Sequence, residues 1–354
     1  MSATSPHRPS SSGLFIDAGR SPRGESRIGK FRVCPQLFAY GERLHFDLIP
    51  AIALTRGSMG HQAMAQQYAK WGAEQGGVSV GFASDVRTLA GSADAASLMD
   101  PEDAIREWTR RNGRGESEID MMKTAFRHYL AKYPEAPGRI LAVEYPLFAV
   151  LGEMGGVWGL WVVDPGDEPK LSQPVSSNPV LRSIHGEAII PTPLNQPGHP
   201  EHGHPIWVSR RADAIYAPWH DIQRPVNCDH KFVAFVEKPG IKAQGYGLDN
   251  GFQLFHHMMA QVWPDYGGCI VQEIQRIKPF RVERMDIPVP GPCMDTLADD
   301  LLYYEQQIAY LDVHRPDMRR WPKANKESGP CRQRYKPGKC PGWDLCYGRE
   351  SRSA

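Results

Sequence analysis

Four cysteines at opposite ends of the sequence place the strongest constraint on its fold. Cys34 lies near the start, and Cys331, Cys340 and Cys346 crowd into the C-terminal segment. The chain has seven cysteines in all and no apolar run at its N-terminus that resembles a secretion signal. Reduced or metal-bound thiols are therefore expected rather than disulfides. The arrangement predicts a clasp that pins the C-terminal segment onto the start of the fold.

The cysteines alone do not decide which metal centre this clasp would hold. Four thiolates can hold a [4Fe–4S] cluster or Zn²⁺. Zinc ribbons normally use two Cys-x-x-Cys pairs, and the sequence has none, which weakens the zinc alternative. The remaining cysteines are interpreted as core or loop thiols, because a buried cysteine behaves as a small hydrophobic residue. These are Cys228, Cys269 and Cys293.

The composition excludes few classes of function. The 354 residues are 41% hydrophobic and 23% charged, which is typical of a soluble globular protein with a sizeable core. The net charge of +1 neither favours nor excludes a nucleic-acid partner, because phosphate binding depends on local clusters of Lys and Arg. No segment reaches the roughly twenty apolar residues that cross a bilayer. We therefore expect a cytoplasmic protein with no membrane partner.

Four segments are expected along the chain. Residues 1–27 are rich in Ser, Pro, Gly and Arg and predict a disordered tail, with folded structure beginning near residue 28. Residues 28–138 hold Cys34 and a mostly helical region. Residues 139–290 form the core, interrupted at 164–205 by a stretch too polar and broken for regular elements, which predicts a surface insertion. Residues 291–354 hold a last helix and the cysteine-rich clasp.

Hydrophobic periodicity predicts the elements of these segments. Helices are expected at 58–75, from Pro101, and at 116–133, 251–263 and 295–312. Strands are expected at 140–148, 157–163, 211–216, 228–236, 269–277 and 280–289. This order predicts an α+β fold with a central mixed sheet.

Acidic and basic groups occur on adjacent predicted strands. Asp213 lies on one, and Asp229 and Lys231 are two residues apart on the next, so the latter two side chains share one face. Such an arrangement can place a metal-binding carboxylate beside an ammonium group at a scissile phosphate. The side chain of His230 points to the other face, which leaves its carbonyl oxygen as a possible metal ligand.

His61 and Gln253 extend this pattern. His61 is expected in the first turn of the helix at 58–75, and Gln253 lies on the helix at 251–263. Oxygen ligands suit Mg²⁺ or Mn²⁺, and an imidazole from His61 shifts the preference toward Mn²⁺. An Asp followed by Asp-x-Lys is more often structural when it stands alone. The order of helix, strands and helix around it instead indicates a metal-dependent nuclease.

In these motifs the chain resembles the RecB-like branch of the PD-(D/E)xK nuclease superfamily. The resemblance is to the iron–sulphur-containing members, which include CRISPR-associated exonucleases, the AddB nuclease domain and related phage exonucleases. The matching pieces are Phe31-Arg32-Val33-Cys34-Pro35 with Tyr40, Gly57-Ser58-Met59-Gly60-His61, Arg211-Ala212-Asp213, Asp229-His230-Lys231, Gln253 with His257, and Cys331, Cys340 and Cys346.

The resemblance implies a restriction-endonuclease-like core with a C-terminal iron–sulphur clasp. It implies that Lys231 is the catalytic lysine and that Gln253 positions the DNA or the lysine. It also favours [4Fe–4S] over zinc on the four cysteines. Metal ligands by the same resemblance are His61, Asp213, Asp229 and the carbonyl of His230.

The implied partner is DNA, single-stranded or at its ends, cut by an exonuclease in recombination, phage replication or CRISPR adaptation. The sequence names no protein partner. His257 stands where the family usually has Tyr, and Arg or Ala replaces a glycine common before the first acid. Glu144 matches a strand glutamate of the family but could equally form a salt bridge.

Several alternatives stay open at this point. The chain could be a catalytically silent nuclease-fold protein that binds DNA or acts as a scaffold, although every expected metal and lysine position is filled. The histidines at 199, 202 and 204 are interpreted as solvated surface. Basic residues after the last helix could track a phosphate backbone, with Trp321 as a stacking platform, or could form a solvated collar. They are Arg315, Arg319, Arg320, Lys323 and Lys326.

Overall fold

One mixed β-sheet lies at the centre of the molecule. The computed structural model describes residues 13–16, 23, 25–44, 52–82, 85–113, 115–177, 180–236, 239–247, 249–288 and 296–323. The sheet has the strand order β10-β9-β8-β7-β3-β1-β2. Its β1–β3 and β8–β9 pairings are parallel, and the other pairings along this order are antiparallel. The bounds are β1 Val78–Gly81, β2 Val86–Leu89, β3 Gly138–Met154, β7 Trp207–Pro218, β8 Val226–Val233, β9 Gly268–Gln275 and β10 Val282–Ile287.

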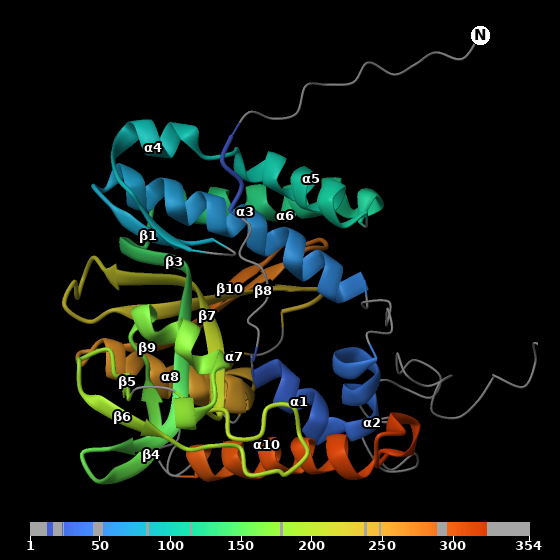
Figure 1. Cartoon of the computed structure of the whole chain (residues 1–354). Coiled ribbons are helices and arrows are strands. Elements are labelled where there is room, and N and C mark those ends of the chain that lie inside the picture. Colours follow the sequence, from blue (N-terminus) through green and yellow to red (C-terminus); the bar gives the residue numbers. More distant parts are fainter. Residues whose placement is uncertain are drawn as a thin grey trace, which may run out of the picture.

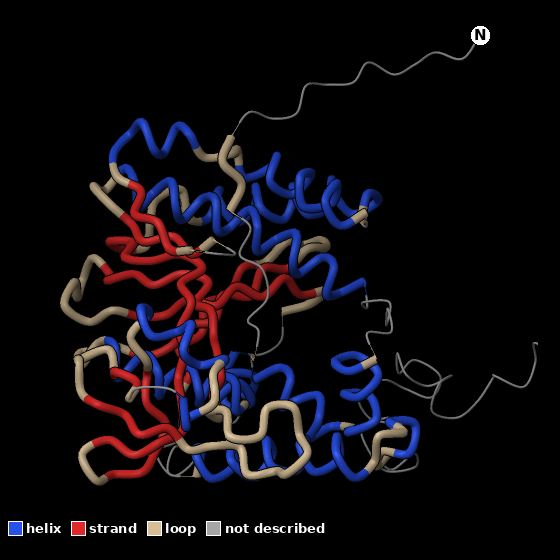
Figure 2. The backbone as a smooth tube through the Cα atoms, in the orientation of Figure 1, coloured by secondary structure: helices blue, strands red, loops and turns tan. Residues whose placement is uncertain are grey.

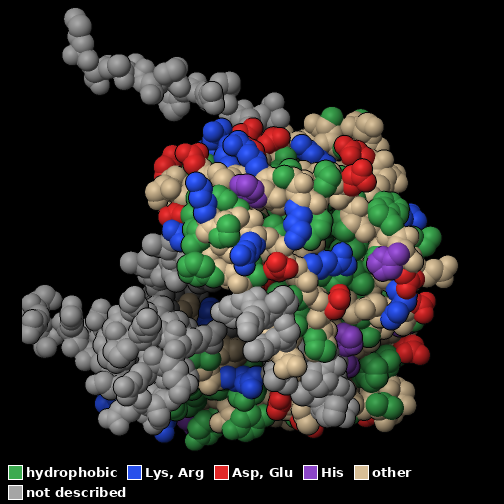
Figure 3. All heavy atoms as spheres, turned by 180° about the vertical axis from the view of Figure 1, so that it is seen from behind, with side chains coloured by type: hydrophobic (Ala, Val, Ile, Leu, Met, Phe, Trp, Pro, Cys, Tyr) green, Lys and Arg blue, Asp and Glu red, His purple; other side chains and the backbone are tan. Residues whose placement is uncertain are grey.

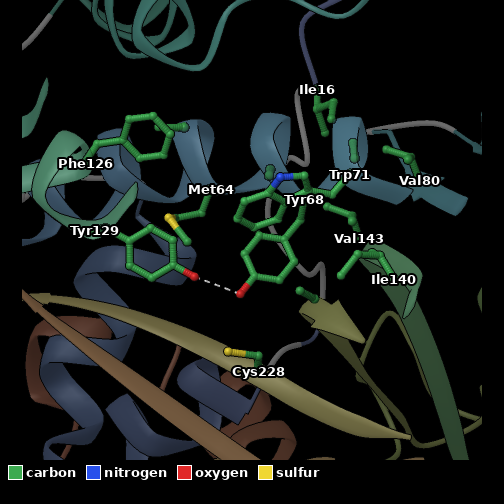
Figure 4. Close-up of a cluster of buried hydrophobic side chains, with 14 of the residues drawn as sticks. Ile16, Met64, Tyr68, Trp71, Val80, Phe126, Tyr129, Ile140, Val143 and Cys228 are labelled. Atoms are coloured by element: carbon green, nitrogen blue, oxygen red, sulfur yellow. Dashed lines mark hydrogen bonds between the residues drawn. The ribbon is translucent and has the colours of Figure 1, made fainter. Parts of the chain in front are cut away.

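A helical layer covers one face of the sheet, drawn at the top of Figure 1. Tyr68 and Tyr129 from two of its helices share a hydrogen bond of 3.0 Å between their hydroxyl groups. Figure 4 shows this pair above the strand that carries Cys228, within a cluster of apolar side chains. The helices are α3 Ile52–Glu74, α4 Gly91–Ser97, α5 Pro101–Asn112 and α6 Ile119–Lys132.

Other helices cover the opposite face, so that the strands run between two helical layers (Figure 2). Their core contains Ala212 and Ile215 of β7, Met258 and Met259 of α8, and Leu301 of α10. The helix α7 packs beside this layer, against β10. The bounds are α1 Glu25–Val33, α7 Pro239–Gly247, α8 Asn250–Val262 and α10 Leu297–His314.

The predicted α+β class with a central mixed sheet is confirmed. All of the predicted strands and helices are present within a few residues of their expected ends, except that α3 begins at Ile52 and β3 continues to Met154. His61 therefore lies in the third turn of α3, and its placement in a first turn was wrong. Strands β1 and β2 were not expected in a mostly helical N-terminal region. Their four-residue length gives only a weak periodic signal.

The segment at 164–205 is more regular than expected. It contains β5 (Leu181–Arg182) and β6 (Ala188–Pro191), and β6 pairs with the far end of β3 beside β4 (Val157–Val162). Leu181 and Ile189 are buried against Val150, while Ile190 is exposed. The prediction of an insertion without regular elements was wrong, because the short apolar run at 188–191 forms a strand within a segment of polar composition.

Part of the predicted N-terminal tail is packed. Phe15 and Ile16 are buried, and the backbone N–H of Leu14 donates to the carbonyl of Ser97 at 2.7 Å. The helix α1 also begins at Glu25. A loosely held tail up to residue 27 is therefore wrong for residues 14–16 and 25–27.

The C-terminal segment returns to the segment that carries Cys34. Trp321 stacks on Phe38 with 6.1 Å between ring centroids, and Pro322 accepts a hydrogen bond from the backbone of Gln36. Trp321 is 1% exposed, so it cannot be a stacking platform for bases, which was one of the two roles that the sequence left open. Cys34 is buried and its sulfur caps the helix α2 (Pro35–Phe38). Cys331, Cys340 and Cys346, like Cys293 and Lys326, lie outside the described residues.

Cys228 and Cys269 are buried in the core, as expected.

Within the described chain, no helix is long and apolar enough to cross a membrane.

Candidate metal centre

Strands β7 and β8 separate at the point where the predicted acids lie. They pair only from Ala214 to Tyr216 on β7, and beyond that point the carboxylate of Asp213 replaces the backbone ladder. The backbone N–H of His230 donates to Oδ2 of Asp213 at 2.9 Å. The N–H and C=O of one strand residue point to the same side. The carbonyl of His230, which the sequence left as a possible metal ligand, therefore faces this fork.

His61 reaches the fork from α3. Its Nδ1 lies 3.0 Å from Oδ2 of Asp213. The helix can approach because residue 60 is glycine: an added Cβ there would collide with the ring of Phe232 on β8. Burial lowers the pKa of His61, but the carboxylate of Asp213 outweighs it and the pKa rises to about 9.

Asp213 remains ionised beside this imidazole. Burial alone would raise the pKa of its carboxyl group. The charge of His61 and the hydrogen bond from His230 outweigh burial and hold the pKa well below its usual range. The fork thus contains a fixed negative charge next to a protonated imidazole.

Glu144 is the third member of the group. On β3, Val143 and Tyr145 lie opposite Ala214 and Ala212, which places Glu144 opposite Asp213. Its backbone has a φ of 50°, in the left-handed region that non-glycine residues rarely adopt. Gly81 of β1 permits this conformation, because a Cβ at that position would overlap the carbonyl oxygen of Glu144.

The carboxyl group of Glu144 is buried among other charges. Burial raises its pKa to about 8, and the neighbouring Asp213 contributes in the same direction. One ligand atom each from Glu144, His61 and Asp213 lies within 4.8 Å of the others. From the sequence, Glu144 ranked low as a site residue. The signal that could have raised it is an acid in the middle of the apolar run 140–148.

Asp229 and Lys231 form an ion pair beside this group. Oδ2 of Asp229 lies 2.6 Å from Nζ of Lys231. Burial lowers the pKa of Lys231, but Asp229 and Asp213 outweigh it and the pKa is raised. Lys231 is therefore a cation at neutral pH. Asp229, expected as a direct metal ligand, is held by this lysine and does not belong to the group of three.

The first turn of α8 lies beside Lys231. The ring of Phe252 is 5.8 Å from Nζ of Lys231, and Gln253 follows it as a buried side chain. His257 points elsewhere: its Nε2 is 2.8 Å from the carbonyl oxygen of Leu160 on β4. The structure thus brings the start of α8 toward Lys231, the predicted catalytic lysine, but does not bring His257 there.

The imidazole of His230 lies on the α3 face, as expected. Its ring is 5.1 Å from that of Tyr68, and its Nδ1 is 3.7 Å from Oδ2 of Asp213.

His199, in the loop before β7, is largely buried. Its Nε2 lies 3.4 Å from Oδ2 of Asp312, so the prediction that this histidine is solvated surface is wrong.

The three grouped side chains fit a divalent cation. Two carboxylates close together repel each other when both are ionised, and a cation between them removes that cost. One imidazole nitrogen with carboxylate oxygens suits Mn²⁺ and, with more water, Mg²⁺. A comparison with family models, curated proteins and solved structures found no match for this chain.

Proposed function

We propose that the chain is a Mg²⁺- or Mn²⁺-dependent deoxyribonuclease of the RecB-like PD-(D/E)xK type. The observation that carries the proposal is the group of His61, Glu144 and Asp213 within 4.8 Å, next to the Asp229–Lys231 ion pair. Phosphodiester hydrolysis needs a divalent cation and a positive charge near the phosphate. The residues at the fork between β7 and β8 support the proposal because they offer three ligands for such a cation and the ammonium group of Lys231 beside them.

The metal would be held by His61, Glu144 and Asp213, with the carbonyl of His230 beside them. When bound, the ion supplies Lewis-acid stabilisation of negative charge on the phosphate. Asp229 orients Lys231 through their ion pair and keeps it protonated. The raised pKa favours Lys231 as an electrostatic stabiliser of the transition state over a role as a general base.

The finer features of the proposal rest on the family resemblance. They are an exonuclease action on single-stranded DNA ends and a [4Fe–4S] cluster held by Cys34 and the three C-terminal cysteines, with Zn²⁺ as the alternative. The contact between Gln36 and Pro322 supports the cluster, since it brings the C-terminal segment to the helix that Cys34 caps.

The proposal predicts that end-labelled single-stranded DNA is degraded in Mn²⁺ and that single substitutions at the fork remove this activity. We expect His61→Ala, Asp229→Ala and Lys231→Ala each to lower kcat by about a hundredfold or more, as for other preorganised charged groups. Denaturing gels at saturating DNA measure the rate.

Matched controls are His220→Ala and Asp265→Asn, which change an exposed imidazole and an exposed carboxylate. Both variants should cleave like the wild type. Equal activity in the fork variants and the wild type would overturn the site assignment. Binding of DNA without cleavage by the wild type in either metal would instead support the catalytically silent alternative.

A further inference from the structure

Arg210 is a cation near the fork that has no part in the proposed reaction. It lies on β7 three residues before Asp213 and is only partly exposed. Within the described part of the chain, no carboxylate lies within ion-pairing distance of Arg210, and its buried Nε has no hydrogen-bond partner. Most other arginines at this depth pair with an acid, such as Arg27 with Glu305 and Arg43 with Asp312.

The guanidinium is nevertheless held in place. Its Cζ lies over the ring of Phe255 on α8, 5.9 Å from the centroid. An arginine on an aromatic face keeps its planar fork of donors available at the edges. Arg210 is also close enough to Lys231 to oppose the rise in the pKa of that lysine. The two cations therefore share one region, on the side of β7 and β8 that α8 covers.

A partly buried guanidinium with an unbonded N–H costs free energy unless an anion joins it. A local anion site also fits the charge distribution. Among the described side chains on the face in Figure 3, Lys and Arg are interspersed with Asp and Glu rather than gathered in one basic field. On that face, a polyanion would therefore meet individual cations rather than one basic field.

We propose that Arg210 binds a phosphate group of the nucleic-acid substrate next to the metal centre, through paired N–H donors to its non-bridging oxygens. The inference rests on the proposed nuclease function and adds to it a substrate-binding residue. Arginine suits this role because its fork matches two oxygens of one phosphate. Phe255 holds the side chain so that less conformational freedom is lost on binding.

The test compares Arg210→Gln, Arg210→Lys and the matched control Arg284→Gln. Arg284 is also a strand arginine over an aromatic ring, 5.9 Å from Tyr216, but it is exposed on β10. A fluorescent single-stranded oligonucleotide is titrated in EDTA, so that no cleavage occurs, at several KCl concentrations. We expect Arg210→Gln to weaken binding by about tenfold. The slope of log Kd against log salt should fall by about 0.7.

Arg210→Lys should keep the salt slope and recover only part of the affinity, because it retains the charge without the paired donors. Arg284→Gln should bind like the wild type. Mn²⁺ binding, followed by calorimetry on each variant, should be unchanged. Wild-type affinity and salt slope in Arg210→Gln would overturn the inference, and so would loss of Mn²⁺ binding in that variant, which would indicate a structural role.

A second readout separates this inference from the nuclease proposal. Inorganic pyrophosphate alone should raise the melting temperature of the wild type and of Arg284→Gln, but not that of Arg210→Gln. This result in a protein that cleaves no DNA would retain Arg210 as a phosphate-binding residue and reject the nuclease. Normal cleavage kinetics in Arg210→Gln would retain the nuclease and reject the role of Arg210.

Discussion

Glu144 and His61 carry protons that a divalent ion would have to displace. The pKa of His61 is raised from 6.5 to about 9, and that of Glu144 from 4.5 to about 8. Near neutral pH the metal-free site therefore holds a protonated imidazole and a neutral carboxyl group. Metal ligands must lose their protons, so binding at this site releases protons.

The two raised pKa values also predict the pH dependence of stability. A group with a higher pKa in the folded protein stabilises it below its unfolded pKa, and this contribution is lost as pH rises through the folded pKa. For His61 the loss falls between about pH 6.5 and 9, and for Glu144 between about 4.5 and 8. The melting temperature in EDTA should therefore fall as pH rises from 6.5 to 9, as measured by calorimetry.

Two comparisons check this prediction. Glu144→Gln should show a shallower fall, because its amide does not ionise, and saturating Mn²⁺ should reduce the fall in the wild type, because the ion replaces both protons. A melting temperature in EDTA that stays constant or rises from pH 6.5 to 9 would contradict the assigned charges.

Residue types predicted part of this site. His61, Asp213, Asp229 and Lys231 could be named from the sequence because their spacing relative to predicted strands and helices is informative. The role of Glu144 could not be settled, because it depends on a left-handed backbone and a register opposite Asp213. Neither feature has a sequence signal at position 144 itself.

At the scale of elements, the spacing between α3 and β8 positions His61. Gly60 faces Phe232, where an added Cβ would collide with the ring, whereas Gly57 has nothing within 4 Å of its added Cβ. Gly60→Ala should therefore push the helix from the sheet and destabilise the protein by about 1–3 kcal/mol. It should also weaken Mn²⁺ binding, because His61 moves with the helix. Urea unfolding and metal titration measure the two effects.

Gly57→Ala is the matched control on the same helix. Alanine is favoured over glycine within helices by about 0.8–1.0 kcal/mol, so this variant should be as stable as the wild type or more stable and should bind Mn²⁺ normally. Equal stability and equal metal affinity in Gly60→Ala and Gly57→Ala would mean that helix spacing does not position His61.

Long periodic elements were predictable and short ones were not. The helices α5, α8 and α10 span several turns with one apolar face, β3 carries long apolar runs, and β7 extends over twelve residues. By contrast, β1 joins the sheet through a parallel pairing with β3. The strand β6 joins it through three residues that pair with the C-terminal end of β3. Such pairings depend on tertiary contacts, which local composition does not encode.

At the scale of the whole molecule, the segment that carries Cys34 meets the C-terminal end of the described chain. Phe31 and Phe38 pack with Ile308 and Trp321 in one apolar cluster. If the four-cysteine cluster forms here, protein purified without oxygen should be brown, with broad absorbance near roughly 400 nm and about four irons per chain. Cys34→Ser should lose this iron and unfold more readily, because the ligands close a very long loop.

Cys269→Ala is the control for this prediction. It removes another buried thiol, which contacts Asn227 at 3.4 Å, and should leave the iron content unchanged. Metal analysis that gives one zinc and no iron would replace the cluster with the zinc alternative. Iron retained in full by Cys34→Ser would exclude that cysteine as a ligand.

The fork between β7 and β8 has a further consequence for the lifetime of the protein. Its three grouped side chains come from α3, β3 and β7, which are far apart along the chain. An ion bound by all three would be lost whenever any one of these elements detached, so partial opening would be opposed along with complete unfolding. Resistance to proteases would then follow the supply of free Mn²⁺ or Mg²⁺, and scarcity of the ion would shorten the survival of the protein as well as slow the cleavage proposed for it.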